Sequence, residues 1–118
     1  MKIKNVFVIL ATLGLLASCA NIDHHPMDMT SAVRNAKTKA DHNALAKHYE
    51  DAAQKMQAKA KAQENQLAEY EAHGSYYGRQ TEDLKEHTRA LARLYQEAAD
   101  ANTSMAKSHR QMAEQAKE

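Results

Sequence analysis

The amino-acid sequence predicts an all-α protein, built as an antiparallel two-helix coiled-coil hairpin. Three observations carry this prediction. The composition favours helices, because the 118 residues include only three Gly, one Pro and no Trp, alongside abundant Ala, Gln, Glu and Lys. Beyond residue 20, glycine occurs only at Gly74 and Gly78. Apolar residues recur at helical spacing on both sides of that glycine pair, so the chain is expected to reverse there.

The first predicted helix covers residues 31–72. Thr30 or Ser31 is a suitable N-cap, and no Pro or Gly interrupts the segment that follows. A mostly apolar stripe runs along it at steps near three and four. Its members are Leu45, Tyr49, Ala52, Met56, Gln63, Leu67 and Tyr70.

The second predicted helix covers residues 80–116, after a turn at residues 73–79. Thr81 with Glu82 and Asp83 gives it an acidic first turn, which suits the helix dipole. One stripe on this helix repeats at strict seven-residue intervals, with Leu94 and Tyr95 beside it. The members of this stripe are Leu84, Leu91, Ala98, Met105 and Met112. Such a repeat predicts left-handed supercoiled packing against another helix, so this stripe is the expected seam of the hairpin.

The two predicted helices also echo each other in sequence. Residues 44–53 and 90–99 are identical at six of ten positions, with Leu and Tyr at the same offsets. Either duplication or selection for one packing face explains the echo. The large apolar side chains are few for so long a hairpin, so a single copy is expected to be marginal in stability. Two copies would bury both stripes by pairing into a four-helix bundle.

Residues 1–18 have the layout of an export signal. Lys2 and Lys4 precede an apolar run over residues 6–16, which is too short to span a bilayer. It ends in Leu16, Ala17, Ser18 and Cys19.

This quartet resembles the lipobox of bacterial lipoprotein precursors. The resemblance implies cleavage before Cys19 and acylation of that residue, and with Ala20 behind it, sorting to the outer membrane, facing the periplasm. Residues 19–30 would then be a lipidated flexible tether and residues 31–118 the hairpin domain. Two alternatives stay open: an ordinary secretory signal with a Cys near its cleavage site, or an apolar helix with a buried thiol.

Histidine and methionine supply the strongest chemical signal in the sequence. A reversal near residue 76 places His42 opposite His109, and the tether enters at the same end of the hairpin. Imidazole and thioether ligands suit copper. The candidate ligands are His24, His25, Met27, Met29, His42 and His109. The competing interpretation is that Met56, Met105 and Met112 fill the core, and that His48, His73 and His87 are solvated or lie at the turn.

The remaining functional signals are weak. The net charge of +1 falls to −1 once Lys2 and Lys4 are removed with the leader, which argues against nucleic-acid binding. The sequence contains no Gly-rich phosphate loop, no nucleophilic Ser motif and no second Cys, so we expect no enzyme activity. Tyr76 and Tyr77 are either a recognition tip or a simple cap on the hairpin.

Two functions are therefore compatible with the sequence. The first is a non-enzymatic outer-membrane lipoprotein, acting as a structural or interaction module that self-associates or binds an envelope protein. The alternative is a periplasmic protein that binds or buffers copper.

Overall fold

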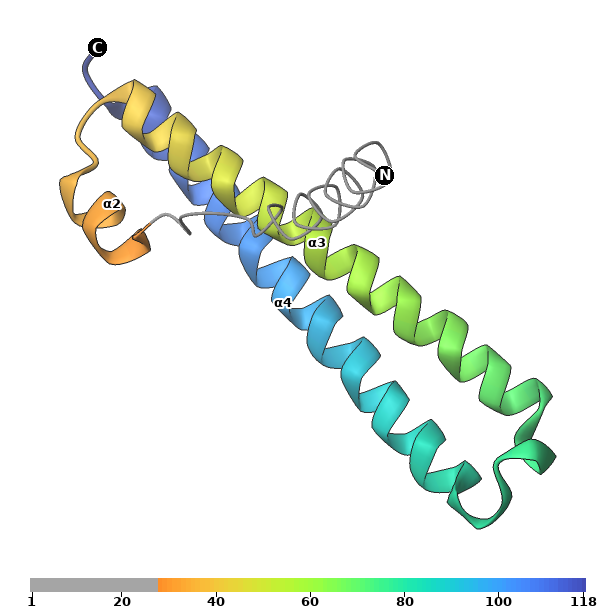
Figure 1. The fold of residues 1–118 in the computed structure, drawn as a ribbon. Coiled ribbons are helices and arrows are strands. Elements are labelled where there is room, and N and C mark those ends of the chain that lie inside the picture. The colour runs from red at the N-terminus through yellow and green to blue at the C-terminus, as the bar shows by residue number, and fades with distance from the viewer. Residues whose placement is uncertain (1–27) are drawn as a thin grey trace, which may run out of the picture.

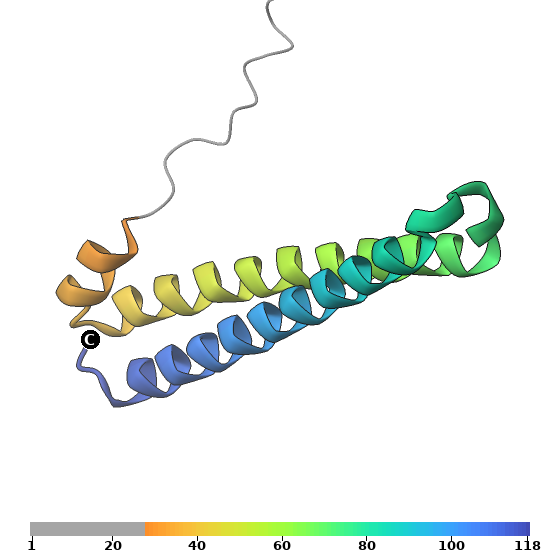
Figure 2. The ribbon, with the colours of Figure 1, turned by 90° about the horizontal axis from the view of Figure 1, so that it is seen from below.

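The computed structural model describes residues 28–118 and contains only helices and their connections over that range. The short helix α2, Met29–Asn35, precedes the long helix α3, Lys39–Ala72. Two 3-10 turns, η2 (Gly74–Tyr76) and η3 (Gly78–Gln80), lead into the second long helix, α4, Thr81–Gln115. Helices α3 and α4 lie side by side along most of their length in both views (Figures 1 and 2). The predicted all-α helical hairpin is confirmed.

The expectation of one continuous helix over residues 31–72 is wrong, because the helix is interrupted between Asn35 and Lys39. Thr38 and Asp41 form a capping box there: the Thr38 hydroxyl accepts from the Asp41 N–H, and the Asp41 carboxylate accepts from the Thr38 N–H. The same carboxylate also accepts from the Lys37 N–H. These side-chain bonds satisfy the free N–H groups of a new helix start, so they compete with continuation of the old helix.

The start of α2 also differs from expectation. The N-cap is Asp28 rather than Thr30 or Ser31, and its carboxylate accepts a hydrogen bond from the Ser31 N–H. Helix α2 lies against the beginning of α3 (Figures 1 and 2).

The hairpin seam is made largely of alanine. Ala46, Ala53 and Ala60 are buried at seven-residue spacing in α3, and half-buried Tyr49, Met56, Gln63 and Leu67 alternate with them. In α4 the matching buried series is Ala99, Ala106 and Ala113. A seven-residue repeat on both helices is the pattern of a coiled coil, and the small alanine side chains let the two backbones approach closely.

The stripe predicted for the second helix is therefore not the seam. Leu91, Met105 and Met112 are 42, 42 and 44% exposed, while Leu84 and Ala98 are only half-buried. The seam lies one residue further along the chain, at Ala99, Ala106 and Ala113. The prediction assigned the seam to the series with the larger side chains. Close packing of two helices instead places the series with the smaller side chains, which has the same seven-residue period, between them. The interpretation of Met105 and Met112 as core residues is wrong for the same reason.

Thr81 closes the turn between the long helices. Its hydroxyl is placed 2.7 Å from the Gly74 carbonyl oxygen and 2.8 Å from that of Gly78. A Cβ at Gly74 would lie 2.9 Å from Thr81 Cγ2, so glycine is needed there for space. Gly78 has φ of +62°, a left-handed conformation that glycine adopts without strain.

The predicted signal at residues 1–18, the acylation site Cys19 and most of the predicted tether lie outside the described residues. Within residues 28–118, no helix is both long and apolar enough to cross a membrane.

Candidate functional site

The most prominent exposed feature of the hairpin is an apolar stripe on α4. We define the α4 stripe as Leu84, Leu91, Ala98, Met105 and Met112, with Leu94 beside it. Leu94 is 54% exposed, and the two methionines and Leu91 are each more than 40% exposed. Apart from Leu94, these residues share one position of the seven-residue repeat, so they form a line along four repeats of α4, next to the alanine seam.

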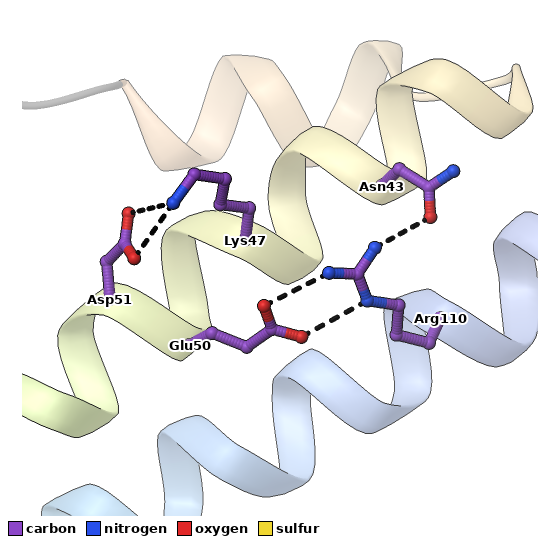
Figure 3. A network of polar contacts seen from close by, with 5 residues as sticks. All are labelled: Asn43, Lys47, Glu50, Asp51 and Arg110. Atoms are coloured by element: carbon purple, nitrogen blue, oxygen red, sulfur yellow. Dashed lines mark hydrogen bonds and ion pairs between the residues drawn. The ribbon is translucent and has the colours of Figure 1, made fainter.

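The opposite flank of the hairpin is polar and carries ion pairs between the helices. The Arg110 guanidinium donates two hydrogen bonds to the Glu50 carboxylate, at 3.1 and 3.0 Å, and a third to the Asn43 side-chain oxygen at 3.0 Å (Figure 3). Arg89 pairs with Glu71 at 3.0 Å toward the turn. Asn43, Glu50 and Glu71 share one heptad position of α3, so these bonds follow a single edge.

On the flank that holds the α4 stripe, the contact between the two helices is a cation–π interaction instead of an ion pair. Lys59 of α3 places its ammonium nitrogen 5.5 Å from the centre of the Tyr95 ring, within cation–π range. Lys59 shares the heptad position of Leu45 and Ala52. The two flanks of the hairpin thus differ: one is bridged by bidentate arginine, and the other presents leucine and methionine.

A histidine pair joins the two long helices at the open end of the hairpin. His42 Nδ1 and His109 Nδ1 are 3.2 Å apart, and the two rings stack with centroids 5.4 Å apart. The Tyr49 ring also stacks on His109, with the two ring centres 5.6 Å apart and the ring planes nearly parallel. The sequence placed His42 opposite His109, and the structure brings these two side chains together.

Burial lowers the pKa of one member of the pair, His109. His109 is only 4% exposed. Desolvation, and then the charge of neighbouring His42, lowers the pKa of His109 below its usual value. The neutral form of His109 is therefore favoured, and the hydrogen bond between the two rings needs one Nδ1–H as donor and one bare Nδ1 as acceptor.

The tip of the hairpin is an aromatic cluster. Tyr76 is 79% exposed, and its ring stacks on His73, whose Nδ1 lies 2.9 Å from the Glu69 carboxylate. Tyr77 instead packs edge-on against buried Tyr70. Of the two tyrosines predicted as an interaction tip, only Tyr76 is strongly exposed, and Tyr77 serves to close the end of the hairpin.

Of the other predicted ligands, only Met29 lies within the described residues. Met29 is the first residue of α2, whereas His24, His25 and Met27 lie outside the described range. Across residues 28–118, no group of three or more His, Cys, Asp or Glu side chains could hold a metal ion. The seven-residue spacing of Ala99, Ala106 and Ala113, which form the observed seam, can be read from the sequence. Choosing these alanines as the seam would also have predicted that the α4 stripe is exposed.

No protein-family model, no curated protein and no solved structure matches this chain in the comparisons. Its function is therefore inferred from its own side chains.

Proposed function

We propose that this protein is a non-enzymatic, lipid-anchored module of the bacterial envelope, whose hairpin associates with a second copy through the α4 stripe. The observation that carries the proposal is the exposure of Leu91, Leu94, Met105 and Met112 in a line next to the seam. Water contact along such a line is unfavourable by about 25 cal/mol for each Å² of apolar surface. Pairing with another helix removes that contact.

A second copy is the partner that fits this stripe best. The stripe has the seven-residue period of a coiled coil, so an equally long helix with the same period matches it along its full length. Two-fold pairing uses the same patch on both subunits, and α4 supplies that patch itself. The opposite flank is bridged internally by Arg110 and Glu50, and it offers no comparable apolar line.

The lipid anchor fixes the direction of pairing. With Cys19 acylated, as the resemblance of residues 16–19 to a lipobox implies, both copies start from one membrane surface. Their hairpins then point the same way, and the two α4 helices run parallel. Confinement to a membrane also raises the local concentration of the copies, which favours pairing through a modest interface.

Sedimentation analysis of a soluble form of the mature chain, beginning after Cys19 at Ala20, tests the association. We expect a dimer whose population rises with protein concentration. Leu91→Lys combined with Met105→Lys places two charges on the stripe and shifts the protein to monomer. The matched control is Ala58→Lys with Ala68→Lys, which changes two exposed residues of α3 and leaves the dimer intact. A helical wild-type chain that stays monomeric throughout the concentration series would contradict the association.

The anchor is tested separately in the native host. Metabolic labelling with palmitate is expected to mark the wild-type protein and not Cys19→Ala. An unlabelled wild-type protein would contradict the anchor without bearing on the stripe.

A further inference from the structure

The His42–His109 pair has the geometry of two ligands on one metal ion. Zinc–imidazole bonds are about 2.0–2.1 Å long, so two tetrahedral ligand atoms lie roughly 3.3 Å apart. The two Nδ1 atoms are 3.2 Å apart in the structure. An ion can therefore replace the hydrogen bond between the rings with little movement of either helix.

The surroundings of the pair suit a bound cation. Arg110 follows His109 in α4, and its guanidinium is held on the polar flank by the Glu50 carboxylate. Tyr49 stacks on His109 and restricts the orientation of that ring. The Asp41 carboxylate next to His42 is engaged in the capping box, so it adds negative charge nearby without being free to move.

We propose that His42 and His109 bind a divalent transition-metal ion of borderline softness, Zn²⁺ or Cu²⁺, through both Nδ1 atoms. The remaining coordination positions are filled by water, because two protein ligands make an open site. Neutral imidazole is the form that binds metal. This site is independent of pairing through the α4 stripe, which lies on a different heptad position.

The consequence of metal binding is a clamp at the open end of the hairpin. His42 is in the first turn of α3 and His109 is near the end of α4. A metal bridge therefore fastens the open end of the hairpin, where the ends of the long helices are expected to fray most easily. Because the ion binds the folded chain at both ligands, it stabilises the hairpin as its concentration rises above the dissociation constant.

Calorimetric titration with Zn²⁺ and Cu²⁺ tests the site in the mature chain carrying His24→Ala and His25→Ala, which removes competing N-terminal ligands. We expect one equivalent of metal for each chain and a melting temperature that rises with metal concentration. His42→Gln removes a direct metal ligand. It should therefore reduce the metal affinity by at least the roughly 10- to 100-fold that is typical when a residue that only supports a ligand is lost. His48→Gln and His87→Gln are the matched controls and should bind like the parent.

An NMR measurement on the parent chain tests the site even if the His42→Gln variant folds poorly. Zn²⁺ should shift the side-chain NMR signals of His42 and His109 together in the parent chain and leave those of His73 and His87 in place. Unchanged affinity in His42→Gln, or no shift of the His109 signals at saturating metal, would overturn the proposal.

Discussion

Met105 and Ala106 are neighbours in α4, yet Ala106 is 3% exposed and Met105 is 42% exposed. The small side chain enters the seam with α3, and the large one stands outside it. Larger apolar side chains are usually the more buried ones, and here the smaller one is. The reason is that two helices packed through alanines leave no space for a larger side chain at the same position. It also leaves leucine and methionine available for another helix.

Enlarging a seam alanine should destabilise the hairpin. Ala99 is fully buried, so Ala99→Leu forces the helices apart and is expected to cost about 1–3 kcal/mol. Urea denaturation at fixed protein concentration measures the loss. Ala58→Leu, at an exposed position of α3, is the control and should change the stability little. An Ala99→Leu protein as stable as wild type would argue against the close alanine seam.

The stability of the hairpin should fall in mild acid. The pKa of His109 is lowered in the folded chain, so below the ordinary histidine pKa of about 6.5 the unfolded chain takes up the proton first. Stability is then complete above that pH and is lost as the pH falls through the folded pKa of His109. Thermal melts across this range check the trend, and His109→Gln should flatten it. An equally steep acid loss in His109→Gln would assign the effect to another group.

The capping box should matter for the start of α3. Thr38→Ala removes the acceptor of the Asp41 N–H hydrogen bond and is expected to cost about 1 kcal/mol. Thr38→Ser keeps the hydroxyl and should retain most of that stability. Equal losses in Thr38→Ala and Thr38→Ser would show that the hydroxyl bond contributes little.

Gly74 and Thr81 should be energetically coupled. Gly74→Ala brings its new Cβ to 2.9 Å from Thr81 Cγ2, and relief by rotation would break the two hydroxyl contacts of Thr81. In Thr81→Ser the methyl is gone and the hydroxyl remains, so Gly74→Ala should cost less in that background. A double-mutant cycle on the free energy of unfolding measures the difference. Strictly additive effects would contradict the steric origin of the glycine requirement.

The sequence predicts the hairpin well because its signals are local. Two glycines within five residues mark the reversal, and uninterrupted helix-forming residues flank them. The break before Lys39 contains neither Gly nor Pro, and only the Thr38–Asp41 pair marks it, so it was missed.

The seam was harder to place, because two seven-residue series run side by side in α4. Side-chain size favoured the series of Leu91 and Met105, while helix packing selects that of Ala99 and Ala106. The approach of His42 to His109 needed only the position of the turn, since the register of an antiparallel pair follows from it.

Cysteine cross-linking of the lipid-anchored protein in membranes, where acylation of Cys19 leaves the introduced thiol as the only free one, tests the pairing of two α4 stripes most directly. Under mild oxidation, Leu84→Cys, Ala98→Cys and Met112→Cys should each give a covalent dimer, because a parallel pair brings identical positions together. Ala58→Cys on the far side of α3 should not. Efficient cross-linking of Ala58→Cys, or none at any stripe position, would contradict pairing through α4.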